Sequence, residues 1–492
     1  MVSIRSVLWI LGISIANILP VQTARALSPP SHLPAAPADK SRLIVLTDIG
    51  TEADDQESMV RLLVYANDFD IEGLVATTST HMRDITHPEL IEERVHAYGQ
   101  ALPNLRVHAA GYPSAESLMK RIRTGLPVYG MAGVGKGMDS GASRLIIATV
   151  DRDDPRPVWV AIWGGAKDLA QALWTVRATR SQAQVEKFVS KLRVYSISDQ
   201  DDAGPWARAN FPRLFWITSV HAFTQYDLST WIGISSSIAG ADQSEVSRQW
   251  LDANIRTKGP LGALYPRPMY IMEGDTPSFL YLIPNGLGSP EHPDWGSWGG
   301  RYGQLASSVG LWADTEDSVK GIDGKSYTDR RATVWRWRTA FQNDFLARMN
   351  WSVTPAFAGA NHPPQVRLNG TGGEGPVEIA ACPHQPVKLT AAGSSDPDGG
   401  QTLTYRWWVY REPGGQISPR ATLAATDGPE TSVTVGSAPD LPKIASLPSY
   451  SIHVILEVAD NGSPSLTSYR RAVITIPGPR SATAGRCLSG AH

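Results

Sequence analysis

Short apolar runs that end at polar turns recur along the first part of the chain and alternate with stretches of helical periodicity. The first run covers residues 43–46, and Met59, Leu62, Leu63 and Ala66 then recur at helical spacing. Further strands are predicted at residues 73–76, 158–162, 192–196 and 214–217. This alternation predicts an α/β domain with a mostly parallel sheet and flanking helices, whose ligand-binding loops follow the carboxyl ends of the strands.

Beyond about residue 360 the period changes from helical to two. Leu403, Tyr405, Trp407 and Val409 alternate with their neighbours, and residues 452–458 and 472–476 add two more apolar segments. Polar turns at residues 394–399 and 459–462 punctuate this region. The pattern resembles the immunoglobulin-like repeats of exported proteins, so we expect an all-β immunoglobulin-like sandwich over residues 362–478.

The first residues are typical of a targeting segment. Arg5 precedes an apolar run over residues 7–19, and Ala24-Arg25-Ala26 supplies a small-x-small cleavage pattern. We therefore expect a signal peptide over residues 1–26, a Pro- and Ala-rich linker over 27–40, and a secreted or periplasmic protein with no transmembrane segment after cleavage. In an oxidising compartment Cys382 and Cys487 either form a disulfide, which would tie the tail at 479–492 to the second module, or remain free thiols.

Composition narrows the range of partners. The 492 residues include 45 basic and 47 acidic side chains without a long run of one sign, which argues against nucleic acid as a partner. The 16 Trp outnumber both the 9 Phe and the 15 Tyr. Flat indole faces suit sugar rings, although core packing accounts for Trp equally well. Nothing in the composition indicates an oligomeric state.

An acidic loop follows the first predicted strand. Asp48, Glu52, Asp54 and Asp55 place four carboxylates within eight positions. A hard divalent cation would hold them together, and Ca²⁺ suits an irregular set of oxygen ligands better than zinc does. The alternative is that Asp54 and Asp55 only stabilise the N-terminus of the following helix.

This loop resembles the Asp-x-Asp-Pro-Gly-x-Asp-Asp motif of inosine-uridine nucleoside hydrolases. It differs because Leu46 replaces the first Asp, Ile49 replaces the proline, and two extra residues separate Gly50 from Asp54. These differences match the nucleoside-hydrolase-like domain of the exported "cellulose-binding protein" family. Further stretches that resemble that family lie at residues 71–79, 162–166, 198–206, 273–278 and 296–302. The resemblance covers residues 41–355 and implies a nucleoside-hydrolase-like catalytic domain.

The resemblance also implies roles for individual residues. Asp48 matches the family's metal ligand and water-activating base, and Asp55 matches a second metal ligand. The backbone carbonyl of Lys167 completes the metal sphere, and Asp275 closes the site as a further ligand and catalytic carboxylate. Asp54 matches a residue that binds a sugar hydroxyl.

Other residues in or next to the matching stretches are expected to contact substrate, namely Ser79, His81, Asp201, Asp202, Glu273, Trp298 and Arg301. Gly274 stands where the family carries a His that protonates the leaving group. Glu273, Asp201 and His81 are then the candidates for the missing general acid.

The sequence thus predicts an exported, calcium-dependent hydrolase that cleaves the glycosidic bond of a furanoside or oligosaccharide, with water activated by Asp48. Two alternatives remain open: a periplasmic hydrolase of N-ribosyl nucleosides, and a carbohydrate-binding protein without catalysis on the same fold.

Overall fold

The computed structural model describes residues 40–306, 308–415, 418–437, 447–478 and 487. The predicted signal peptide, nearly all of the predicted linker and most of the predicted tail lie outside these residues. Among the helices described, none combines the length and the apolar character needed to cross a membrane.

The N-terminal part of the protein is built on an eight-stranded sheet in the order β3-β2-β1-β4-β5-β6-β8-β7. Neighbouring strands are parallel except β7, which runs antiparallel to β8. The strands are β1 (Ser41–Thr47), β2 (Phe69–Ala76), β3 (Ile122–Thr124), β4 (Val158–Ile162), β5 (Leu192–Ser196), β6 (Phe215–Thr218), β7 (Tyr302–Gln304) and β8 (Leu311–Asp314).

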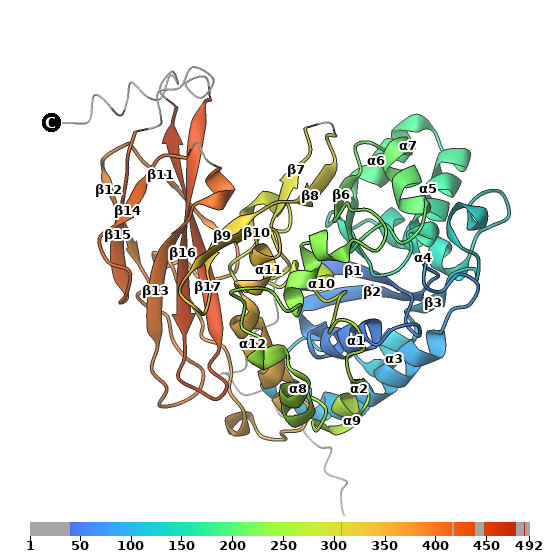
Figure 1. The fold of residues 1–492 in the computed structure, drawn as a ribbon, viewed down its shortest axis with the longest axis horizontal. Coiled ribbons are helices and arrows are strands. Elements are labelled where there is room, and N and C mark those ends of the chain that lie inside the picture. Colours follow the sequence, from blue (N-terminus) through green and yellow to red (C-terminus); the bar gives the residue numbers. More distant parts are fainter. Residues whose placement is uncertain (1–39, 307, 416–417, 438–446, 479–486, 488–492) are drawn as a thin grey trace, which may run out of the picture.

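Both faces of this sheet are covered by helices, as the apolar run of β1 predicts. Leu43 and Val45 point into one core cluster, whereas Ile44 and Leu46 point into a second cluster on the opposite face. Successive side chains of a strand alternate between faces, so a continuous apolar run can be buried only between two helical layers. Helices α1, α2 and α12 contribute to the first cluster, and α4 to α7 contribute to the second (Figure 1).

The α-helices have the bounds α1 (Asp54–Val64), α2 (Pro88–His108), α3 (Ala115–Met119), α4 (Gly141–Asp151), α5 (Lys167–Thr179), α6 (Gln182–Ser190), α7 (Ala203–Asn210), α8 (Arg248–Asn254), α9 (Gly259–Ala263), α10 (Pro277–Leu280), α11 (Ala332–Trp335) and α12 (Arg338–Trp351). The α/β fold class predicted from the sequence is confirmed. Strands β4 and β5 have the predicted bounds, and β6 begins one residue later than predicted.

The C-terminal part is β-rich. A four-stranded sheet has the order β11-β17-β16-β13, and a three-stranded sheet has the order β12-β15-β14. Residues from both sheets share one apolar cluster, so the two sheets form a sandwich. The strands are β11 (Val377–Ala380), β12 (Pro386–Thr390), β13 (Thr404–Tyr410), β14 (Ala421–Leu423), β15 (Glu430–Val435), β16 (Ser449–Ala459) and β17 (Thr467–Pro477). Its immunoglobulin-like character stays a prediction.

Cys382 and Cys487 form a disulfide. This result decides between the two alternatives that the sequence left open. The bridge connects Cys382, which follows β11, to a residue of the predicted tail.

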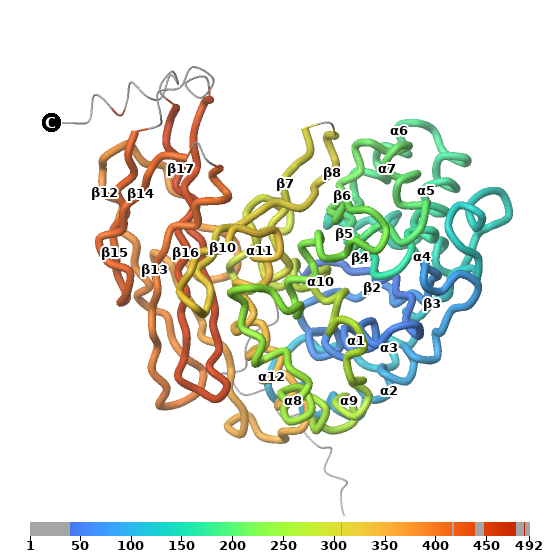
Figure 2. Tube along the Cα trace, viewed as in Figure 1, coloured from blue at the N-terminus to red at the C-terminus, as the bar shows by residue number. Residues whose placement is uncertain are grey.

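The sandwich packs closely against the N-terminal part. Figure 2 shows its orange and red strands beside the yellow hairpin of β9 (Asp317–Lys320) and β10 (Ser326–Asp329). Across this contact the Tyr410 hydroxyl donates a hydrogen bond of 2.6 Å to Asp317 Oδ2. Asp317 is fully buried and also pairs with Arg301 and Arg336. Both ion pairs lie within the N-terminal part, and the Tyr410 hydroxyl connects them to the sandwich.

Candidate functional site

A cavity of about 490 Å³ lies beyond the carboxyl end of β1, where the sequence places the acidic loop. This is the edge at which open α/β sheets bind ligands. The residues that line the cavity are Asp48, Thr51, Glu52, Asp54, Asp55, His81, Trp163, Ile197, Gln200, Tyr226, Asp227, Trp231, Ile232, Ser236, Tyr270, Ile271 and Asp275. The structure therefore brings together five of the predicted site residues from three separate stretches of the chain.

Asp48 directly follows β1, and its side chain is buried and closely packed. Burial raises the pKa of its carboxyl group, and a hydrogen bond from the Ser79 hydroxyl opposes that rise. A Cβ atom at Gly164 would lie 2.6 Å from Asp48 Oδ1. Only glycine therefore leaves room for the Asp48 carboxylate, which explains why the Gly164-Gly165 turn follows β4 at this point.

Three further carboxylates converge on one point. One oxygen atom from each of Asp54, Asp55 and Asp275 lies within 4.8 Å of the others. The Thr47 hydroxyl donates a hydrogen bond to Asp55 Oδ1. Asp275 Oδ2 is buried and has no hydrogen-bond partner among the described residues. An acceptor in that position is costly unless another group binds it.

The charged groups that shift the pKa values in this cluster are all carboxylates. Burial raises the pKa of Asp55 and of Asp275 well above the usual range, and the negative charge of the neighbouring carboxylates adds to the effect. Burial, assisted by Glu52 and Asp48, raises the pKa of Asp54 to about 7. A divalent cation would relieve this repulsion, and an all-oxygen donor set fits a hard cation.

Packing around residue 274 explains why this position is a glycine. A Cβ atom there would lie 2.6 Å from Asp54 Oδ2 and 3.1 Å from the Trp231 ring. The histidine expected from the nucleoside hydrolase motif would therefore collide with the Asp54 carboxylate and with the Trp231 indole. The departure from the motif follows from this packing.

The sequence did not single out the aromatic walls of the cavity. Trp163 follows β4, and its indole N–H donates a hydrogen bond of 2.8 Å to Ser278 Oγ. Tyr226 and Trp231 come from the loop after β6, and Tyr270 is 80% exposed at the cavity surface. In the sequence, only position could have indicated Trp163, Tyr226 and Trp231, because each of them follows the carboxyl end of a strand.

Gln200 was likewise missed. Its amide nitrogen donates a hydrogen bond of 2.6 Å to the Trp163 carbonyl, and its Oε1 is buried without a partner among the described residues. That oxygen is therefore an acceptor with capacity for a ligand hydroxyl.

Three residues predicted to contact substrate lie elsewhere. Glu273 forms a fully buried ion pair of 2.6 Å with Arg61, and its other oxygen accepts from Tyr265. Trp298 packs at the seam with the sandwich, where its indole N–H lies 3.4 Å from the Tyr469 hydroxyl. Arg301 pairs with Asp317 at the same seam. These side chains do not line the cavity because they are committed to internal contacts.

Three predicted site residues near the turns after β4 and β5 also do not line the cavity. Asp201 accepts backbone hydrogen bonds of 3.0 Å from Ala203 and 3.1 Å from Lys167, so it organises the starts of α5 and α7. Asp202 is exposed and accepts from the Met131 amide at 2.7 Å. The Lys167 ammonium donates to the Leu126 carbonyl, while the role of the Lys167 carbonyl as a metal ligand stays a prediction.

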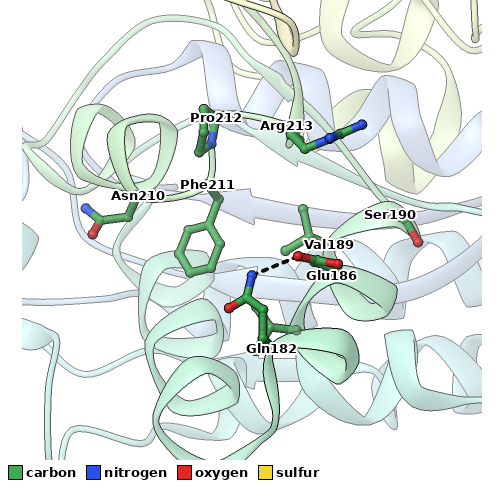
Figure 3. A pocket seen from close by; sticks show the side chains of 9 residues that line it. Gln182, Glu186, Val189, Ser190, Asn210, Phe211, Pro212 and Arg213 are labelled. Carbon is green, nitrogen blue, oxygen red and sulfur yellow. Dashed lines mark hydrogen bonds between the residues drawn. The ribbon is translucent and has the colours of Figure 1, made fainter.

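A second cavity of about 540 Å³ lies between α6 and the segment before β6 (Figure 3). It borders the amino end of β6, away from the acidic loop. Its carboxylate, Glu186, accepts a hydrogen bond of 2.9 Å from Gln182, and Phe211 and Val185 supply apolar surface. This cavity lacks the convergent carboxylates of the first cavity, so the acidic site is the candidate functional site.

The fold and the acidic site together define a nucleoside-hydrolase-like protein. The family described as "Cellulose-binding Sde182, nucleoside hydrolase-like domain" matches residues 42–302, and "Cellulose-binding protein Sde0182, C-terminal domain" matches residues 386–476. The chain belongs to this family. The domain limits outside those matches stay predictions.

A solved structure supports the assignment. It is a nucleoside hydrolase-related hypothetical protein from Saccharophagus degradans that is associated with carbohydrate metabolism. The identity is 36%, the TM-score is 0.75, and the match covers 89% of this chain and 100% of that one. The effector proteins XOO4466 and XopQ, the latter complexed with adenosine diphosphate ribose, match at 8% identity with TM-scores of 0.34 and 0.35, which are too low to show a shared fold. The first covers 67% of this chain and 95% of its own, and the second 66% and 96%. A comparison with curated proteins gave no match.

Proposed function

We propose that the protein is an exported, calcium-dependent hydrolase that cleaves an O-glycosidic bond of a furanoside or oligosaccharide. The observation that carries this proposal is Asp275, whose Oδ2 is buried without a partner among the described residues and whose carboxylate converges with those of Asp54 and Asp55 in a cavity at the carboxyl end of β1. Perturbed carboxylates that converge in a cavity are typical of a reaction site.

The residues that would hold the cation are Asp48, Asp55, Asp275 and the Lys167 carbonyl. These ligands are all oxygen atoms, and Ca²⁺ accepts such irregular sets more readily than Mg²⁺ does. When bound, the cation supplies positive charge beside the attacking water and offsets the repulsion among the carboxylates.

Asp48 is the base in this proposal. Its carboxylate accepts a proton from the attacking water while the Ser79 hydroxyl holds the carboxylate in place. Direct attack by water inverts the configuration at the anomeric carbon. Asp54 and Gln200 Oε1 accept hydrogen bonds from sugar hydroxyls, and the Trp231 face packs against the sugar ring.

Two observations favour a sugar leaving group over a nucleobase. Gly274 removes the histidine that protonates a base in nucleoside hydrolases, and the packing of Asp54 and Trp231 leaves no room for it. The Saccharophagus degradans relative, which is associated with carbohydrate metabolism, points the same way.

Purified protein should be assayed against chromogenic glycosides and free nucleosides, with added calcium and with chelator. We expect calcium-dependent hydrolysis of a glycoside and none of the nucleosides. Hydrolysis of nucleosides alone would move the assignment to a periplasmic nucleoside hydrolase. A mature chain that begins near Leu27 in the exported fraction would support the localisation.

Carbohydrate binding without hydrolysis is the second candidate, because the family description names cellulose binding. It predicts that the same cavity binds saccharides while no glycoside is turned over under any metal condition.

A further inference from the structure

In this chain the nucleoside-hydrolase motif lacks the histidine that usually protonates the leaving group. The structure excludes two of the three residues that the sequence suggests as a replacement acid. The Glu273 carboxylate is fully buried in its ion pair with Arg61. Asp201 accepts hydrogen bonds from the backbone at the starts of α5 and α7. Neither carboxylate lines the cavity, so neither can reach a leaving group there.

His81 remains, and its position ties it directly to the base. The backbone N–H of His81 donates a hydrogen bond of 2.9 Å to Ser79 Oγ. The same hydroxyl bonds the Asp48 carboxylate. One short turn after β2 therefore fixes a base and a histidine on the same cavity. Histidine is the side chain that most often transfers protons near neutral pH.

The His81 ring is oriented from the other side of the cavity. Its Nε2 lies 3.2 Å from the Tyr226 hydroxyl, and the ring centroids are 6.4 Å apart. Burial, with the charges of Glu52 and Asp48, raises the pKa of Tyr226, so its hydroxyl stays protonated. When His81 is an imidazolium, Nε2–H donates to the Tyr226 oxygen, and Nδ1–H has no acceptor among the described residues.

We propose that His81 is the acid that protonates the leaving oxygen and that Tyr226 is its positioning residue. The inference rests on the proposed hydrolase function and completes it. Water oxygen bonds to the anomeric carbon as the glycosidic carbon–oxygen bond breaks, and the bonding electron pair stays on the leaving oxygen. Asp48 gains the water proton, the leaving oxygen gains the Nδ1 proton of His81, and solvent restores both groups.

The test compares two leaving groups. An alkyl glycoside needs a proton to depart, whereas p-nitrophenolate departs without one. His81→Gln keeps an amide that can bond Tyr226 but has no proton to give. We expect kcat to fall about 100- to 10,000-fold on the alkyl glycoside and less than about tenfold on the p-nitrophenyl glycoside. His81 is exposed, and melting curves should match those of the unsubstituted protein.

His221→Gln is the matched control. The His221 ring is 5.1 Å from the Tyr226 ring, and its Nε2 lies 2.7 Å from Ser198 Oγ, but His221 does not line the cavity. It should keep both rates. Tyr226→Phe should show a smaller loss than His81→Gln, with the same dependence on leaving group.

The outcomes separate the two levels of the proposal. The acid assignment alone would be overturned if His81→Gln lost the same activity on both glycosides or lost none on either. It would also be overturned if His221→Gln showed the same dependence on the leaving group. Absence of hydrolysis by the unsubstituted protein on both glycosides would overturn the hydrolase function and the inference with it.

Discussion

Replacement of Asp275 by Asn should stabilise the calcium-free protein and remove most of the stabilisation that calcium gives. In the calcium-free protein, Asp275 adds negative charge to Asp54 and Asp55, whose oxygen atoms lie within 4.8 Å. At an effective dielectric constant of about 20, each pair at that distance costs about 3 kcal/mol at a pH where both of its carboxyl groups are ionised. Asn removes both pairs and keeps the shape, so the calcium-free Asp275→Asn protein should have the larger free energy of unfolding.

The pH dependence fixes the sign of this effect. Burial and neighbouring charge raise the pKa of Asp275 above its value in the unfolded chain. The folded calcium-free protein therefore binds more protons than the unfolded chain, and its free energy of unfolding falls as the pH rises from about 4. The advantage of Asp275→Asn should grow over the same interval.

Calcium should act against this difference. At a calcium concentration of about 100 times Kd, binding stabilises the unsubstituted protein by about 2.7 kcal/mol, and Asp275→Asn loses most of that gain because a charged ligand is gone, so the advantage of the variant should shrink by about that amount. Urea unfolding in chelator and in calcium measures both differences. Asp227→Asn is the control, since Asp227 lines the cavity outside the converging cluster. Equal shifts in the two variants, or a calcium-free Asp275→Asn protein that is less stable, would refute the cation site.

Three further predictions follow from single contacts. Gly274→His displaces the Asp54 carboxylate and should weaken calcium binding roughly 10- to 100-fold by calorimetry, whereas unchanged affinity would contradict the packing argument. Burial lowers the pKa of His108 to about 4, so the unfolded chain takes up a proton at a higher pH than the folded protein does. The free energy of unfolding should therefore decline by about 1–3 kcal/mol as the pH falls from about 6.5. His108→Gln should flatten that decline in urea titrations. Tyr410→Phe removes the hydroxyl that donates to Asp317 and should cost about 1.5–3 kcal/mol in urea unfolding, against no change if the seam is unimportant.

The sequence predicted what depends on local periodicity. Leu43 to Leu46 are apolar at every position because β1 is covered on both faces, and this run of four residues was enough to predict a buried parallel strand. The acidic loop was recognised for the same reason, since its carboxylates are neighbours in sequence. Asp275 joins them from more than two hundred positions away, and only the resemblance to nucleoside hydrolases connected it to them.

Residues whose role depends on tertiary contacts were predicted less well. Trp298 and Arg301 belong to a stretch that resembles the family, yet both lie at the seam with the sandwich, and no pattern along the sequence shows where that seam forms. Tyr226 lines the cavity from a three-residue 3-10 helix and Tyr270 from a loop, and neither segment carries a periodic signal. Gly274 could be seen as a departure from the motif, but its cause is the Asp54 carboxylate, which lies beside it only in the folded chain.

Asp48→Asn tests the central claim most directly, with turnover and saccharide affinity measured on the same two proteins in calcium and in chelator. The substitution keeps the shape and one ligating oxygen but removes the base. We predict that calcium-dependent kcat falls about 100- to 10,000-fold while saccharide affinity changes far less. Equal calcium-dependent hydrolysis by both proteins would contradict the role of Asp48, and hydrolysis by neither, with saccharide still bound, would show a binding protein on a hydrolase fold.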